Sequence, residues 1–175
     1  MLVFGVAVFA RAQSTPSEYQ IKSAYLYNFA KFVDWPPQIF NSPESPLTIG
    51  VLGDNVFGPD LEQVVQGKKV NGHPLVCRFA TDPEQLTNAQ IVFISPSEKK
   101  RVEKVLATFK DLNVLTVSQM EHFTASGGMV NFVLVDNKVR FQINDASARK
   151  SGLEISSKLL SLAIPDDSQK DAKSK

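Results

Sequence analysis

The feature of this sequence that most constrains its fold is an alternation of short apolar runs with segments that carry helix-start signals. The apolar runs are Leu47–Leu52, Pro74–Ala80, Ile91–Ile94 and Val114–Val117. Helices are expected between them, from about Phe57 to Val65 and again after Ser95-Pro96-Ser97-Glu98, where an N-cap serine, a proline and a glutamate follow one another. Buried strands that alternate with helices form a largely parallel sheet covered on both faces. We therefore predict an α/β fold with a mostly parallel central sheet.

A different pattern near the end of the chain predicts an antiparallel hairpin. Met129–Val135 and Lys138–Asn144 flank Asp136-Asn137, a two-residue link of the kind that hairpins use. Apolar and polar residues alternate in the second arm, so one face of it is expected to be buried and the other polar. We expect a bend at Gly127-Gly128, a short helix over Asp145–Lys150 ended by Gly152, and a last helix capped by Ser156 or Ser157.

The first helix is expected to begin at Ser17, with Gln20 completing a capping box, and to stop near Asp34, because Pro36 disfavours helical geometry in the residue before it. Its predicted core face consists of Ile21, Tyr25, Phe29 and Phe32, widened by Ala24 and Asn28, with Lys22 and Lys31 toward the other side. Six aromatic residues lie between positions 25 and 40, and Tyr27 shares the outer side of this helix with Lys31, four residues away. We therefore take Tyr27, Lys31 and Phe40 as a candidate interface.

The two ends of the chain are predicted to lie outside the folded domain. Leu2–Ala10 is too short for a membrane span, since nine helical residues reach about 14 Å, but it fits the apolar region of a signal peptide cleaved after Ala10-Arg11-Ala12. No basic residue precedes this run, so the signal is weak or its start lies upstream; a disordered or buried N-terminal strand is the alternative. We predict a signal peptide over residues 1–12, one α/β domain over 13–165 and a disordered charged tail over 166–175.

Residue patterns that carry catalysis or metal binding are not found. His73 and His122 are the only histidines, and neither has a ligand-type neighbour at metal spacing. The net charge of +1 and the absence of a basic stripe argue against nucleic acid as a partner. The sequence predicts no enzyme activity, no cofactor and no metal. A small-ligand site near Gly53-Asp54 and Ser95 stays open, because open α/β sheets place ligands at the carboxyl ends of their strands.

Six blocks of sequence resemble the YfiR family, in the same order and over about Glu18 to Ala163. They are residues 18–36, 49–53, 91–95 and 114–118, then the hairpin blocks 127–132 and 139–144 taken together, and 152–160. Their residues that we expect to have structural roles are Tyr25, Asn28, Phe29, Trp35, Pro36, Gly53, Gly127, Gly128, Arg140, Phe141, Asn144, Gly152, Ser156 and Ser157.

The resemblance implies a periplasmic, non-catalytic regulator that is often dimeric. In the best-known system such a protein represses an inner-membrane diguanylate cyclase by binding its periplasmic sensor part, and an outer-membrane lipoprotein relieves the repression. Relatives that use disulfides differ from this chain, because its lone Cys77 cannot form one within the chain. The alternative interpretation is a periplasmic small-ligand sensor that acts on a histidine kinase or another envelope partner.

Overall fold

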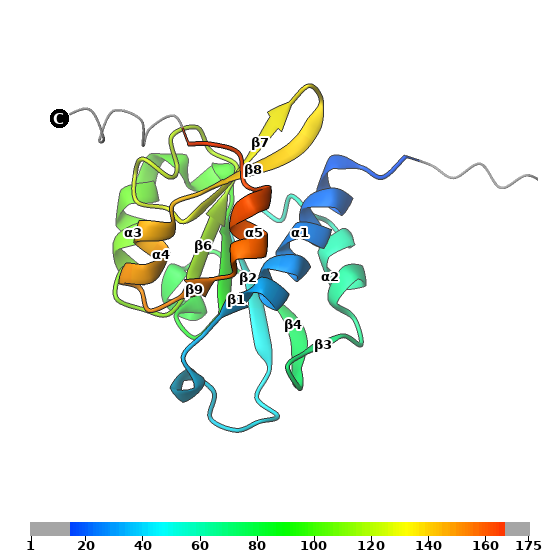
Figure 1. Cartoon of the computed structure of the whole chain (residues 1–175), viewed down its shortest axis with the longest axis vertical. Coiled ribbons are helices and arrows are strands. Elements are labelled where there is room, and N and C mark those ends of the chain that lie inside the picture. The colour runs from blue at the N-terminus through cyan, green and yellow to red at the C-terminus, as the bar shows by residue number, and fades with distance from the viewer. Residues whose placement is uncertain (1–14, 167–175) are drawn as a thin grey trace, which may run out of the picture.

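A computed structural model of the chain describes residues 15–166, and a seven-stranded sheet lies at its centre (Figure 1). The strands are β1 (Val33–Asp34), β2 (Leu47–Leu52), β3 (Lys69–Val70), β4 (His73–Ala80), β5 (Ile91–Ile94), β6 (Leu115–Ser118), β7 (Val130–Val135), β8 (Lys138–Ile143) and β9 (Glu154–Ile155). The α-helices are α1 (Glu18–Phe32), α2 (Asp60–Val65), α3 (Val102–Phe109), α4 (Asp145–Lys150) and α5 (Ser157–Leu162), and three 3-10 turns are η1 (Pro37–Ile39), η2 (Pro83–Leu86) and η3 (Pro96–Arg101). The predicted signal peptide and all of the predicted tail except Asp166 lie outside the described residues.

The strand order confirms the predicted mostly parallel sheet with a C-terminal hairpin. The order is β3-β4-β2-β5-β6-β7-β8, and every pair from β4 to β7 is parallel. The edge strands β3 and β8 are antiparallel to their neighbours. Asp136 and Asn137 both have positive φ, 48° and 58°, as a tight two-residue hairpin turn requires. The short pair β1–β9 forms a separate antiparallel sheet, which the sequence did not predict.

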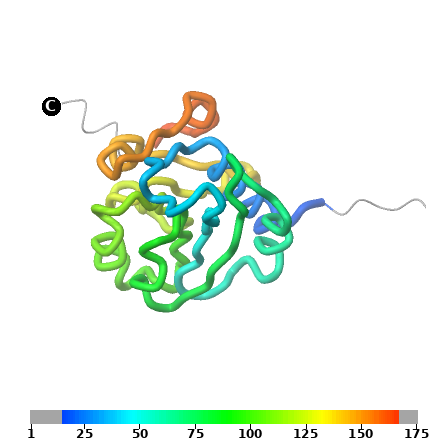
Figure 2. The backbone as a smooth tube through the Cα atoms, turned by 90° about the horizontal axis from the view of Figure 1, so that it is seen from below, coloured from blue at the N-terminus to red at the C-terminus, as the bar shows by residue number. Residues whose placement is uncertain are grey.

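Two hydrophobic layers cover the two faces of the sheet. On one face, α1, α2 and α5 pack over the strands, and Leu26, Leu61 and Leu159 are at most 2% exposed. On the other face, α3 and the turn η2 contribute Val105, Phe109 and Leu86 to a second core. Figure 2 shows α3 (light green) on the opposite side of the molecule from α1 and α2 (blue and cyan-green).

The buried face of α1 differs from the predicted one. Lys22 is only 2% exposed although it was placed on the outer side, whereas Ala24 is exposed. The Lys22 ammonium group is satisfied inside the protein, because it pairs with the Glu18 carboxylate and donates a hydrogen bond to Gln119 Oε1 at 2.6 Å. A buried lysine is tolerated when its charge is paired and its stem packs against apolar groups. Ser17 and Gln20 form the predicted capping box.

The segment after Ser95 is helical but begins with a 3-10 turn, and the predicted N-cap bond of Ser95 is not formed. Glu98 pairs with Arg101 three residues later, and side chains at this spacing eclipse one another in a 3-10 helix. The Ser95 hydroxyl is buried without a partner among the described residues.

The α2 helix begins later than predicted, at Asp60, after a turn that includes Phe57.

Candidate functional site: a lysine–aromatic surface on α1

Tyr27 and Lys31 of the predicted interface lie together on the outer side of α1. The Lys31 Nζ atom lies 5.5 Å from the centroid of the Tyr27 ring and 5.7 Å from that of Phe32. Both rings are half-buried, whereas Lys31 is exposed. A lysine within about 6 Å of an aromatic ring is attracted by the ring's negative face. Lys31 therefore lies beside two rings that belong to its own helix.

Two further lysines, from elements on either side of α1, extend this arrangement. Lys68, in the turn after α2, has its Nζ atom 5.3 Å from the Tyr27 centroid. Lys158, on α5, has its Nζ atom 5.1 Å from the Phe32 centroid. We call Tyr27, Lys31, Phe32, Lys68 and Lys158 the lysine–aromatic surface. Lys68 and Lys158 were not predicted, because only the packing of α2 and α5 beside α1 brings them there.

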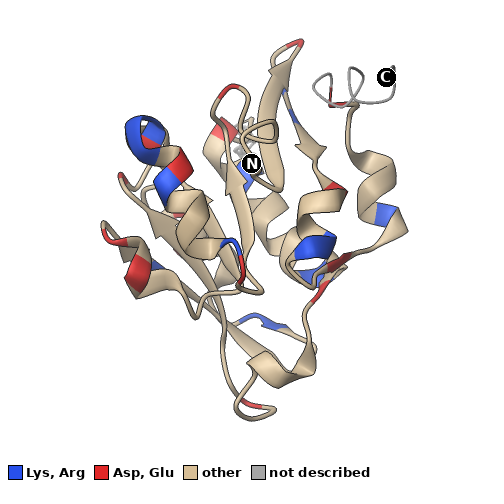
Figure 3. Cartoon of the chain, turned by 90° about the vertical axis from the view of Figure 1, so that its left-hand side faces the viewer, with Lys and Arg blue, Asp and Glu red and all other residues tan. Residues whose placement is uncertain are grey.

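The charges of this surface are not neutralised by the folded domain. Within residues 15–166, none of Lys31, Lys68 and Lys158 has a carboxylate at ion-pair distance; the three ion pairs recorded there join other residues. Three neighbouring ammonium groups over half-buried rings favour contact with acidic groups that bring apolar surface with them. By contrast, Figure 3 shows basic and acidic residues interspersed on the side of the molecule that faces the viewer there.

Phe40, the third residue of the predicted interface, belongs to a different part of the surface. Its ring stacks on that of His73, with centroids 3.9 Å apart and planes 18° apart. The Nδ1 atom of His73 is 2.7 Å from the Ser45 carbonyl oxygen. These two rings line a hollow of about 450 Å³ with Trp35. The structure therefore does not bring Phe40 together with Tyr27 and Lys31.

At the ligand site predicted near Gly53-Asp54 and Ser95, the two loops contact each other. The Ser97 hydroxyl accepts a hydrogen bond from the Asp54 amide at 3.0 Å, and a side chain added at Gly53 would collide with Ser97 and Glu98. Gly53 also has a φ of 86°, which favours glycine. This junction between β2 and β5 is the usual ligand position in such a sheet, but here the loops pack on each other. Among the described residues, no cluster of three or more His, Cys, Asp or Glu side chains that could hold a metal ion is present.

The α1 residues of the predicted structural set pack in the core or close to it. Phe141 is 1% exposed, and its ring meets those of Tyr25 and Phe29 at centroid distances of 5.2 and 5.3 Å. Asn28 is half-buried. Trp35 and Pro36 follow the end of α1, and the Trp35 indole N–H is buried without an acceptor among residues 15–166.

The later residues of that set are mostly at caps and bends. Asn144 caps α4 by accepting the Ser147 amide at 3.1 Å, and Ser156 rather than Ser157 caps α5 by accepting the Leu159 amide at 3.2 Å. Gly127 and Gly152 have φ values of 100° and 71°, and Gly128 lies against the ring of Phe123. Arg140 is exposed on β8.

Cys77, on β4, packs partly against the core beneath α2. Burial, with a smaller contribution from the negative charge of Glu62, raises the pKa of its thiol to about 12. A cysteine with so high a pKa is a poor nucleophile at neutral pH. Within residues 15–166, the structure contains no helix with the length and apolarity that a membrane crossing requires.

Comparisons with known proteins place this geometry in context. A family profile described as YfiR/HmsC-like matches residues 19–164. A search of the curated proteins returns no match. Among solved structures, the chain is similar to the crystal structure of a conserved domain protein from Vibrio cholerae O1 biovar El Tor strain N16961, with a TM-score of 0.57 and 10% sequence identity. The likeness covers 85% of this chain but only 60% of the Vibrio protein, and at that identity it shows a shared fold.

Proposed function

Because this chain belongs to the YfiR/HmsC-like family, we propose that it is a periplasmic regulatory protein that binds and represses the periplasmic sensor part of an inner-membrane diguanylate cyclase. In this role it limits the synthesis of cyclic-di-GMP and acts by contact with a partner rather than by catalysis. An outer-membrane lipoprotein that relieves the repression and a homodimeric state are further parts of the proposal.

The observation that carries the proposal is the family match over residues 19–164, which includes almost the whole of the described domain. The lysine–aromatic surface supports it, because unpaired ammonium groups beside half-buried rings can attract an acidic partner surface. We infer that this surface contacts an acidic part of the sensor segment. Electrostatic complementarity of this kind increases association rates and selects the partner.

A genetic experiment tests the proposed repression. Deletion of the gene should raise cellular cyclic-di-GMP, and expression of the wild-type chain in the deletion strain should restore the original level. An unchanged cyclic-di-GMP level in the deletion strain would contradict repression of a cyclase. Purification of a tagged chain from envelope fractions should recover a membrane protein that has a cyclase domain.

Charge reversal tests the surface separately. Lys31→Glu combined with Lys158→Glu should release the cyclase in the envelope purification and leave cyclic-di-GMP as high as in the deletion strain. The matched control is Lys138→Glu, which reverses an exposed lysine on the hairpin, away from this surface. If the double variant and the control both restore repression, the lysine–aromatic surface is not the interface, whereas the repressor role is untouched.

A further inference from the structure

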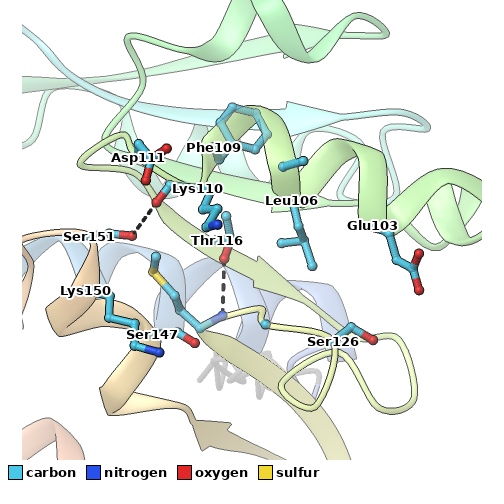
Figure 4. A pocket seen from close by; sticks show the side chains of 13 residues that line it. Glu103, Leu106, Phe109, Lys110, Asp111, Thr116, Ser126, Ser147, Lys150 and Ser151 are labelled. Carbon is cyan, nitrogen blue, oxygen red and sulfur yellow. Dashed lines mark hydrogen bonds between the residues drawn. The ribbon is translucent and has the colours of Figure 1, made fainter.

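A cavity of about 500 Å³ lies between α3 and α4, on the face of the sheet that α3 covers (Figure 4). It exists because the connection from β6 to β7, residues 119–129, forms turns rather than a helix. Parallel strands are usually joined by a crossover helix that packs on the sheet. Without such a helix, α3 and α4 are left as walls on either side of an open space above β6.

Hydrogen bonds between the elements hold this cavity open at one end. The Ser151 hydroxyl, after α4, donates to the Lys110 carbonyl oxygen at 3.2 Å. The side-chain Nδ2 atom of Asn113 donates a hydrogen bond to the Ser151 carbonyl oxygen at 2.8 Å. Because Ser151 both donates to and accepts from the segment after α3, the spacing of the two helices is fixed there. The cavity is therefore a preformed feature of the fold.

The wall formed by α3 and the floor of the cavity are largely apolar. Leu106 and Phe109 line it from α3, and Met129 lines it from the end of the β6–β7 connection. Figure 4 shows the Leu106 side chain pointing from α3 toward this space. Leu106 is half-buried and Ala107 is exposed, so these two side chains present apolar surface to the cavity, whereas Phe109 and Met129, 1% and 4% exposed, pack behind it. Such a surface suits the aliphatic body of a small ligand.

Hydrogen-bond donors face the same space. Thr116, on β6, is 2% exposed and accepts the Met129 amide at 3.2 Å through Oγ1. No acceptor for its own hydroxyl hydrogen is recorded within residues 15–166, so a donor without an acceptor lies beneath the cavity floor. Ser147 and Lys150 line the cavity from one side of α4, where residues three apart are neighbours.

The charged side chains at the rim limit the charge that a ligand can carry. Lys150 and Lys110 have no ion-pair partner among the described residues, whereas Glu103 and Asp111 line the same cavity. Figure 4 shows Asp111 beside Lys110 and Glu103 at the other end of α3. Lys150 belongs to the opposite wall, on α4, and the two carboxylates disfavour a ligand with more than one negative charge.

We propose that this cavity binds a small aliphatic monocarboxylate, with its hydrocarbon body against Leu106 and Ala107 and its carboxylate near Lys150. The proposal is independent of the partner and of the proposed repression, since it concerns the isolated chain.

Calorimetric titration of the full chain with octanoate and with 1-octanol tests the charge requirement. Octanoate should bind at least about tenfold more tightly than 1-octanol, because a charge-assisted hydrogen bond is lost in the alcohol. Lys150→Met, which keeps an unbranched apolar stem, should remove most of this difference. Lys104→Met is the matched control, since Lys104 is exposed on α3 and does not line the cavity. Equal affinity for the two probes, or equal behaviour of the two variants, would overturn the proposal.

A variant that fills the cavity tests whether octanoate binds there. Ala107 is exposed at the wall of the cavity, so Ala107→Trp should fold normally and occupy the space that the ligand needs. Octanoate binding should then fall by at least about tenfold, with the thermal midpoint of unfolding unchanged as the check on folding. Wild-type affinity in a folded Ala107→Trp variant would show that octanoate binds elsewhere, and the proposal would fail.

Discussion

Asp34 and Glu154 lie directly opposite each other in the β1–β9 pair, so two exposed carboxylates face one another across a sheet only two residues long. This pair joins the end of α1 to the segment that leads into α5. The connection is extended by the Ser156 amide, which donates to the Phe32 carbonyl oxygen at 2.9 Å. Like charges at directly opposed positions destabilise an antiparallel pair.

Replacement of Glu154 by lysine should therefore stabilise the fold. We expect Glu154→Lys to raise the free energy of unfolding by about 0.2–1 kcal/mol at low salt, because repulsion across β1–β9 becomes attraction. Denaturant titration measures this change, and the gain should shrink at about 1 M salt. Glu154→Gln is the control and should give a smaller gain. A loss of stability in both variants would mean that Glu154 has a favourable contact that outweighs the repulsion.

The β1–β9 pair also shows why part of the fold was not predictable. Strand signals in a sequence come from runs of alternating or apolar residues, and Val33-Asp34 and Glu154-Ile155 are each only two residues long. Their pairing depends on where α1 ends and where the chain returns after α4. Lys158 reaches Phe32 for the same reason. Contacts that only tertiary packing creates leave no local signal.

Local chemistry was predictable where neighbouring residues decide the outcome. The Ser17–Gln20 capping box and the Asp136-Asn137 turn are present because each depends on residues within a few positions. The burial of Lys22 was not predictable, because it depends on Gln119, which lies 97 residues later in the sequence. The candidate interface was predicted in part: Tyr27 and Lys31 lie together, but Phe40 lies apart from them.

Gly128 tests the packing of the β6–β7 connection. A Cβ atom at this position would overlap the ring of Phe123, which is 1% exposed and cannot swing into solvent. Gly128→Ala should lower the free energy of unfolding by about 1–3 kcal/mol, as overpacking does. Ser126→Ala, two residues earlier at an exposed position, should change it by less than about 0.5 kcal/mol.

Relief of the overlap gives an independent check on that mechanism. If the ring of Phe123 is the obstacle, Gly128→Ala combined with Phe123→Leu should cost less than the sum of the two single changes. Additive costs in denaturant titration would show that the ring of Phe123 is not the obstacle.

Lys22 tests how a buried charge is stabilised. Its Nζ atom lies 5.0 Å from the Tyr19 centroid and pairs with Glu18, whose side chain is 39% exposed. Lys22→Met should be close to neutral for stability, because an apolar stem of similar length replaces a charge that was costly to bury.

Glu18→Gln should be more harmful than its exposure suggests, because it leaves the buried Lys22 ammonium group without a negative counter-charge, with only neutral oxygens to accept its hydrogen bonds. We expect a loss of about 1 kcal/mol, below the cost of breaking a fully buried pair because water reaches Glu18. Chemical denaturation of both variants provides the comparison. Greater damage from Lys22→Met than from Glu18→Gln would contradict this account.

Cys77 should react slowly while the protein is folded. Its pKa is raised from 9.0 to about 12, first by burial and then by Glu62, so the thiolate is scarce at pH 8. Alkylation by iodoacetamide at pH 8 should be at least about tenfold slower in the native protein than in denaturant. Glu62→Gln should speed the native reaction slightly, because it removes only the smaller cause.

The same pKa shift makes stability depend on pH. Between about pH 9 and pH 12 the unfolded chain has released the Cys77 proton while the folded chain retains it, so the unfolded state binds fewer protons there. The free energy of unfolding therefore falls as the pH rises through this range, and the contribution is absent below about pH 9. Cys77→Ala should show a shallower fall between pH 8 and pH 10.5 in denaturant titrations, although its stability at pH 7 also reflects lost packing. Parallel pH profiles for the two proteins would show that the thiol is ionised as easily in the folded state as in the unfolded chain.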